Sequence, residues 1–362
     1  MQLQKRAKKW IAAVVAAVVG IGAVVALVCG LPLIRMAANA SRYAFAPVAE
    51  STGGDRIHFL NTQSADAILL ESAGHFALID AAEDSDNPRN LPGLVYDGYE
   101  EKVFSYLKKA ASDAEGNVSL DFIVGTHAHS DHLGGFDTLL NDPAVQVKTA
   151  YLKAYQPRWI TEYERESWDN QEVYDQMINA CYAHGVQVIQ KIPDERFTFG
   201  NFTITFFNTE DYVGPKQRGE NENSLGILVE KDGKRVFLAG DINNADGTED
   251  ALGPQIGHVD VLKVGHHGYA GSTSAGFAQA LSPDIAILTN TIHGIDAQVR
   301  KNLNRMDTAI YGTKEHDGIV LAFEEDGLKL YDQIHLACAV WRRGSIGYAG
   351  LSKGPAGAGQ AV

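Results

Sequence analysis

The sequence predicts an α/β fold in which two β-sheets pack face to face with helices on the outside. Two observations predict it. The chain contains two successive groups of short apolar strands, each followed by helical segments, and polar or imidazole side chains stand directly after several of these strands. The 362 residues are enough for one large domain or two ordinary ones.

The first group of strands opens the domain as a succession of hairpins, with Gly74 near one turn. An amphipathic helix, a buried strand, a further strand and a long helix follow. The expected strands are 56–61, 66–71, 75–80, 121–126 and 147–152, and the expected helices are 98–112 and 165–184.

The second group repeats this arrangement. Strands come first, then strands alternate with helices, and two final strands close the domain. The expected strands are 196–208, 225–231, 235–239, 259–264, 284–289, 317–324 and 327–332, and the expected helices are 273–281 and 297–305.

The N-terminus differs from the rest of the chain. Four basic residues between positions 5 and 9 precede an uncharged apolar run, 10–34, which is long enough to span a bilayer. Because the basic flank favours the inner side, residues 1–36 are expected to be a cytoplasmic flank and membrane anchor, with the domain outside the cell. A signal peptide cleaved near Ala38–Ala40 is the alternative, and it would make the protein secreted.

The remaining boundaries follow from composition. Residues 37–54 are rich in Ala, Ser and Gly and are expected to be a linker, 55–335 form the folded domain, and the Gly/Ala-rich 336–362 form a flexible tail. Residues 41–362 contain 26 basic and 45 acidic residues, a net charge of −19. This part of the chain therefore lacks the basic surface that a nucleic-acid binder needs.

The densest chemical signal is the six-residue run from His127 to His132. It places His127, His129, Asp131 and His132 directly after the expected strand 121–126. These are ligand types that Zn²⁺ and similar metals prefer. In extended chain His127 and His129 point to the same side and can hold one metal, while Asp131 and His132 follow the bend and can face a second.

Three further strand ends carry polar side chains. Asp241 follows the strand 235–239 and can bridge two metals. Asp80 stands at the end of the strand 75–80 and can orient a ligand side chain by a hydrogen bond without binding the metal itself. His266 and His267 follow the strand 259–264, and neighbours on extended chain face opposite ways, so one of the two is expected to bind metal. His267 is the preferred ligand and His266 its neighbour, although the reverse stays open.

These residues, in this order and spacing, resemble the metallo-β-lactamase fold superfamily. The resemblance implies an αββα sandwich with a dinuclear metal site at one edge of the sheets. The apolar run 10–34 predicts one transmembrane helix before this domain. Segments such as 57–60, 223–225, 239–241 and 266–268 are similar to the hydrolase domain of competence DNA-uptake channels. Others, including 151–153, 168–170, 185–190, 247–250 and 253–257, are similar to teichoic-acid phosphorylcholine esterases.

The chain departs from the superfamily pattern in two ways. Many members supply a third His to the first metal, but His184 is the only His between the cluster and Asp241, and it is expected to cap a helix. The first metal is therefore expected to hold His127, His129 and Asp241. The second departure is that no C-terminal choline-binding repeat array is present.

The function expected from these residues is phosphoester hydrolysis at the cell surface by two divalent cations, Zn²⁺ by default and Mn²⁺ or Fe²⁺ as alternatives. Asp131, His132, Asp241 and His267 would hold the second metal. Asp131 is also a candidate catalytic residue, together with His266 and His293, either of which could protonate the leaving oxygen.

The substrate is expected to be a phosphorylcholine-type or other envelope phosphodiester, bound without a nucleic-acid partner. Trp159, Tyr163 and Trp168 are candidates for a cation–π cage around choline, and Asn223 is a further candidate for substrate binding. An extracellular competence-like nuclease is the alternative within the same class. A lactonase and a non-catalytic metal-binding surface protein also stay open.

Overall fold

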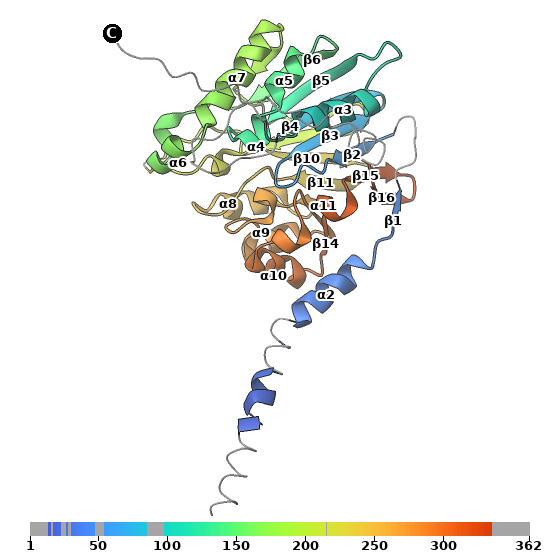
Figure 1. Cartoon of the computed structure of the whole chain (residues 1–362), viewed down its shortest axis with the longest axis vertical. Coiled ribbons are helices and arrows are strands. Elements are labelled where there is room, and N and C mark those ends of the chain that lie inside the picture. Colours follow the sequence, from blue (N-terminus) through green and yellow to red (C-terminus); the bar gives the residue numbers. More distant parts are fainter. Residues whose placement is uncertain are drawn as a thin grey trace, which may run out of the picture.

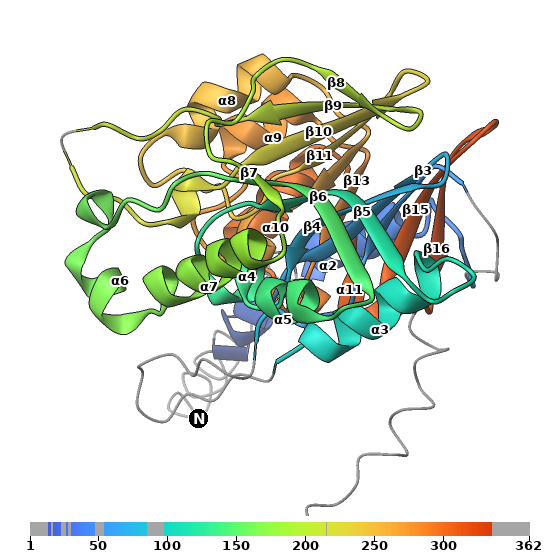
Figure 2. The same ribbon diagram turned by 90° about the horizontal axis from the view of Figure 1, so that it is seen from above.

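Two β-sheets pack face to face with helices covering both outer surfaces, as the sequence predicts (Figure 1). The computed structural model describes residues 14–15, 17–22, 27, 30–47, 54–84, 98–214 and 216–334. One sheet has nine strands and the other has seven, so the two layers together span the whole of the described domain. Figure 2 shows the helical layers on the two sides of the sandwich.

The nine-stranded sheet has the order β1-β16-β15-β2-β3-β4-β5-β6-β7. Its centre is a set of antiparallel hairpins, and β4, β5, β6 and β7 run parallel to one another. The bounds are β1 Phe45–Pro47, β2 Arg56–Phe59, β3 Ala67–Ser72, β4 His75–Ala81, β5 Val118–Gly125, β6 Val145–Leu152, β7 Gln187–Ile189, β15 Ile319–Glu324 and β16 Gly327–Asp332.

The seven-stranded sheet has the order β14-β13-β12-β11-β10-β9-β8. Strands β11 to β14 are parallel, so their carboxyl ends meet at one edge. The bounds are β8 Phe197–Phe199, β9 Phe202–Phe207, β10 Gly226–Lys231, β11 Lys234–Leu238, β12 Val261–Lys263, β13 Ile285–Leu288 and β14 Ala309–Gly312.

The helices form two layers. The nine-stranded sheet is covered by α3 Glu100–Ala110, α4 Ser130–Leu133, α5 Phe136–Asn141 and α7 Asn170–Ala183, and α6 Glu162–Ser167 lies at its edge before α7. The seven-stranded sheet is covered by α8 Thr248–Ile256, α9 Ala275–Leu281 and α10 Ala297–Arg305, and the short α11 Thr313–His316 follows β14.

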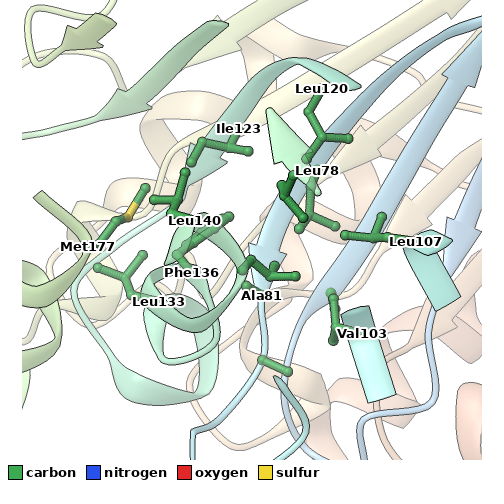
Figure 3. Close-up of a cluster of buried hydrophobic side chains, with 14 of the residues drawn as sticks. Leu78, Ala81, Val103, Leu107, Leu120, Ile123, Leu133, Phe136, Leu140 and Met177 are labelled. Atoms are coloured by element: carbon green, nitrogen blue, oxygen red, sulfur yellow. The ribbon is translucent and has the colours of Figure 1, made fainter. Parts of the chain in front are cut away.

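Three apolar clusters hold the layers together. One lies between the sheets, one lies between the seven-stranded sheet and its helices, and the third lies between the nine-stranded sheet and α3, α5 and α7. Figure 3 shows the third cluster, in which Leu78 and Ile123 from the strands meet Leu107, Phe136 and Met177 from the helices. Buried apolar area of this kind is the main driving force for folding.

The predicted elements differ from the observed ones in several places. The helix expected over 165–184 is two helices, α6 and α7, because the chain is extended at Trp168 between them. Helix α8 was not expected, since it contains Gly253 and Pro254, which are poor helix formers. Strand β14 was also not expected.

The residues before the domain are partly built into it. Helix α2 (Leu31–Ala40) lies against α10 and β14, and β1 pairs in parallel with β16, so residues expected to be a linker contribute a strand. Among the described residues no helix is both long and apolar enough to cross a membrane. Much of the predicted anchor, including 1–13 and most of 23–29, lies outside the described residues, as does the whole of the predicted tail, 336–362.

Candidate metal centre

The side chains that the sequence singles out meet where strands of both sheets end. The His127–His132 run follows β5, and His129 stands directly before α4. Asp241 follows β11 of the other sheet, and His267 lies in the short 3₁₀ turn Gly265–Gly268 after β12. The centre is therefore formed by both sheets at a shared edge of the sandwich.

Six predicted ligands form two groups that share one carboxylate. One group is Asp131, His132, Asp241 and His267, and the other is His127, His129 and Asp241; within each group the ligand atoms all lie within 4.8 Å of one another. These are the two sets that the sequence predicts, with His267 rather than His266 in the first. Their binding of metal ions stays a prediction.

Three atoms of the first group fit a metal ion better than they fit one another. His132 Nε2, His267 Nε2 and Asp241 Oδ1 are buried and form no hydrogen bond. His132 Nε2 lies 3.2 Å from Asp241 Oδ1, and His267 Nε2 lies 3.3 Å from Asp131 Oδ2, but neither contact has hydrogen-bond geometry. Buried polar atoms without partners are costly, and a cation at the point on which they converge would satisfy them.

The charges in the two ligand groups also favour the binding of a cation. Burial opposes the charge of Asp241, yet the imidazoles of His267 and His132 hold the pKa of its carboxyl well below the usual range. Burial and the neighbouring rings of His132 and His129 hold the pKa of His127 well below its usual value. His127 is thus a neutral imidazole, the form that binds metals, beside a buried carboxylate that needs positive charge.

The far nitrogens of the ligand imidazoles are held by neighbours. His132 Nδ1 lies 2.7 Å from Asp80 Oδ2, and Asp80 is fixed in turn by the backbone N–H and hydroxyl of Thr126, both at 2.8 Å. His267 Nδ1 lies 3.0 Å from the hydroxyl of Thr289. Such contacts set the orientation of a ligand ring, so Asp80 lies where its expected orienting role requires.

Glu164 holds His129 in the same way, and sequence reasoning missed it. Its Oε1 lies 2.8 Å from His129 Nε2, which leaves Nδ1 facing His127 Nε2 at 2.9 Å. Asn170 and the backbone N–H of Glu220 also donate to Glu164. No local motif could have revealed this contact, because Glu164 belongs to α6, which returns to the site from 35 residues along the chain.

A buried ion pair beneath the centre was also missed. Lys263 is fully buried, pairs with Asp66, and donates to the carbonyl of Gly240 at 2.8 Å. Asp66 Oδ1 lies 3.3 Å from His267 Nδ1, and Lys263 Nζ lies 3.8 Å from Asp241. A sequence signal did exist, since a lysine within the buried strand β12 must find a partner.

The backbone around the ligands is strained. His266 and His267 both adopt left-handed conformations, with φ of 48° and 50°. Gly240 has φ of 51°, and a side chain there would lie 3.1–3.2 Å from Ser224 and Thr126. Non-glycine residues in this region cost energy and persist where the surrounding structure imposes them. The turn at His266–His267 thus directs the His267 ring into the centre.

The profile of the Beta-lactamase superfamily domain family matches residues 78–272, more than half of the chain. The chain belongs to this family. Proteins of the superfamily are in general metal-dependent hydrolases, in agreement with the candidate ligands gathered at the shared edge of the two sheets.

Two curated relatives belong to the competence branch that the sequence resembles. The chain is 26% identical over 212 residues to ComE operon protein 3 of Bacillus subtilis, which covers 57% of this chain and 25% of that protein. It is also 26% identical over 257 residues to Recombination protein 2 of Haemophilus influenzae, and the match covers 67% of this chain and 28% of that protein. The chain thus spans about a quarter of the length of these relatives.

Solved structures give low similarity. The metallo-β-lactamase fold protein YhfI from Bacillus subtilis is 14% identical, with 71% of this chain and 95% of that chain covered and a TM-score of 0.42. Zn²⁺-bound PqqB from Methylobacterium extorquens is 14% identical, with 71% and 86% covered and a TM-score of 0.42. The family assignment rests on the profile match.

In this member of the Beta-lactamase superfamily, one of the two histidines predicted to be catalytic, His266, lies next to the metal centre, and the other, His293, is exposed. The His266 ring packs edge-on against Tyr269, and its buried Nδ1 has no hydrogen-bond partner. His266 is therefore next to the centre without joining either ligand group. His293 is exposed in the turn Ile292–Gly294, and among the described residues no side-chain contact joins it to the centre.

The expected aromatic cage is not assembled around one point. Trp168 packs on His129 with 4.8 Å between ring centroids, so it borders the centre. Trp159 packs against Tyr212 and lines a small pocket with Asn223, whose amide is bonded to Glu220. Tyr163 is 71% exposed. Among the described residues no ring contact joins any two of the three aromatic residues.

His184 lies at the end of a helix, as the sequence predicts. It is the C-terminal cap residue of α7, and its Nε2 lies 3.0 Å from the side chain of Asn141. It belongs to none of the candidate ligand groups. Among the described residues, the ligand group around His127 and His129 therefore contains only Asp241 besides these two.

Proposed function

We propose that this protein is a dinuclear metal-dependent hydrolase of phosphodiester bonds. One observation carries the proposal: two groups of ligand atoms, all from buried residues except Asp131, share Asp241, so two cations would be held next to each other. Paired cations suit in-line displacement at phosphorus, since they bind the attacking and leaving oxygens together.

The roles of the residues follow from their positions. His127, His129 and Asp241 would hold one cation, and Asp131, His132, Asp241 and His267 the other. When bound, the two cations supply charge neutralisation for the phosphoryl oxygens and a water of lowered pKa. Glu164 and Asp80 keep the rings of His129 and His132 in the orientation that this requires.

His266 is the proposed partner of the leaving oxygen. It is held next to His267, and its Nδ1 is buried without a partner in the described structure. A substrate oxygen would satisfy that nitrogen by a hydrogen bond. His293 has no comparable support, because its side chain is exposed and no described side-chain hydrogen bond joins it to the centre.

The proposed substrates are small or polymeric envelope phosphodiesters, with phosphorylcholine esters as the test case. The net charge of −19 over residues 41–362 supports a substrate other than a long polyanion. Trp168 at the edge of the centre supports recognition of an organic or cationic head group. We place the protein at the cell surface, held by the apolar N-terminal run.

A nuclease is the second candidate, and the two competence relatives favour it. A single-stranded nucleic acid offers the same phosphodiester bond to the same centre. The experiment must also separate a lactonase and a non-catalytic metal-binding protein from these two candidates.

The test uses the full chain, stripped of metal and reloaded with Zn²⁺, Mn²⁺ or Fe²⁺. We expect hydrolysis of p-nitrophenyl phosphorylcholine and bis-p-nitrophenyl phosphate, lost in Asp241→Asn and retained in Asp250→Asn, an exposed residue on α8. Cleavage of single-stranded DNA without choline preference would identify the nuclease. Metal binding with turnover of a lactone alone, or with no turnover, would overturn the proposal.

A further inference from the structure

A groove lies between α2 and α10, on the side of the domain from which the N-terminal segment projects (Figure 1). Its volume is about 240 Å³, and its lining combines apolar side chains from the N-terminal segment with cations. The residues that matter are Leu27, Leu31, Pro32, Arg35, Lys301 and Arg305.

The walls of the groove are fixed relative to each other. The side chain of Asn304 on α10 donates to the carbonyl of Pro32 at 3.1 Å, and Tyr311 on β14 donates to the carbonyl of Ala40 at 2.7 Å. Arg35 forms an ion pair with Asp307 at 2.6 Å. These contacts hold both ends of α2, so the groove is part of the folded domain.

The charge of the groove is opposite to that of its surroundings. Residues 41–362 carry a net charge of −19, yet Lys301 and Arg305 are exposed side by side on α10. In the described part of the chain no carboxylate lies within ion-pair distance of either one. Arg305 lies in the last turn of α10, where the helix dipole stabilises a positive charge that has no carboxylate partner. Lys301 lies outside that turn, so the dipole does not account for its unpaired charge.

The apolar side of the groove is exposed. Of the residues that line the groove, Leu27 is 65% exposed and Leu31 53%, and the nearby Ile34 of α2 is 66% exposed. Most of the exposed large apolar side chains in the described structure belong to residues 14–34. Exposed apolar surface bordered by cations is the pattern of a surface that meets a lipid bilayer.

We propose that this groove binds an anionic phospholipid, independently of the hydrolytic site. Lys301 and Arg305 would contact the phosphate of the headgroup, and Leu27, Leu31 and Pro32 would contact an acyl chain. Arg35 is already neutralised by Asp307, so it would serve as part of the wall. The site would fix the orientation of the domain against the membrane surface.

The test is a calorimetric titration of the full chain in neutral maltoside micelles with short-chain phosphatidylglycerol. We expect saturable binding, weakened about 30-fold in the double variant Lys301→Glu/Arg305→Glu. Two cations near an anionic lipid surface together contribute about 2 kcal/mol to binding, which corresponds to this change in affinity. The matched control is Lys108→Glu/Lys109→Glu, which makes the same charge change at exposed positions of α3 and is expected to bind as the native chain does.

Three further ligands separate the contributions. Phosphatidylcholine with the same chains should bind weakly, and so should glycerol phosphate and inorganic phosphate, which lack acyl chains. Equal binding of phosphatidylcholine would overturn the role of the cations. Inorganic phosphate binding as tightly as the lipid, or an equal loss in the α3 control, would overturn the lipid site.

Discussion

The buried ammonium group of Lys263 balances the buried carboxylate of Asp66 next to the metal centre. Lys263 is fully buried and contacts Asp66 and the carbonyl of Gly240, so Lys263→Met removes the ammonium partner of a buried carboxylate, which keeps its contacts with the His267 ring and the Thr289 hydroxyl. We expect a loss of unfolding free energy of roughly 3–5 kcal/mol. Equilibrium urea unfolding of the metal-free chain measures it.

The control for Lys263 is Lys234→Met, which breaks a half-exposed ion pair with Asp260 and is expected to cost at most about 1 kcal/mol. Adding Asp66→Asn to Lys263→Met should recover part of the lost stability, because it removes the buried charge that has lost its ammonium partner. If Lys263→Met were as stable as the native chain, the ion pair would have no structural role.

Glu164 is expected to act on metal affinity through His129. Glu164→Gln weakens the hydrogen bond that orients the ring, and changes to such partners lower metal affinity by about 10- to 100-fold. Competition with a chromophoric chelator measures the affinity. Glu162→Gln is the matched control, since Glu162 is exposed on the same helix. Equal affinities in the two variants would contradict the role of Glu164.

Single residues show where sequence reasoning succeeds and fails. The predicted ligands could be found because four of them lie within one six-residue run, and the others stand directly after apolar strands. Glu164, Asp66 and Lys263 could not be placed, because their contacts depend on how α6 and the second sheet fold back onto the first.

At the scale of elements, the N-terminus of α9 depends on a buried carboxylate from α8. Glu249 accepts hydrogen bonds from the backbone N–H groups of Thr273 and Ser274, and burial raises the pKa of Glu249 from 4.5 to about 7. Because the folded pKa lies above the unfolded one, the folded state binds more protons between these values. Stability from this group is therefore lost as the pH rises from about 4.5 to about 7.

The predicted change in unfolding free energy across that window is on the order of 3 kcal/mol. Urea midpoints of the full chain between pH 5 and pH 8 measure it. Glu249→Gln should flatten the dependence, whereas Glu172→Gln, at an exposed position on α7, should leave it unchanged. A native-like slope in Glu249→Gln would show that the dependence has another source.

Elements with strong apolar periodicity were predicted close to their observed bounds, and the others were not. Strand β4, expected over 75–80, spans His75–Ala81, and α10 matches the expected 297–305. The break between α6 and α7 was missed because Trp168 has no helix-breaking character of its own. Its extended conformation accompanies the packing of its ring on His129.

At the scale of the whole molecule, each sheet supplies part of the centre, so metal binding and packing of the sheets must be coupled. His127, His129, Asp131 and His132 follow β5, and Asp241 and His267 follow β11 and β12 of the other sheet. An ion held by both sets opposes their separation. A ligand that binds only the folded state raises its stability by mass action.

Removal of metal should therefore lower the thermal midpoint of the full chain. At a free metal concentration of about one hundred times the dissociation constant, the expected stabilisation is about 2.7 kcal/mol. Differential scanning calorimetry with and without chelator measures it. Asp241→Asn should lose most of the response, because Asp241 belongs to both ligand groups, while Asp250→Asn should respond as the native chain does. A midpoint that chelator leaves unchanged in the native chain would mean that the two sheets hold together without the ions, and that the ligands serve another purpose.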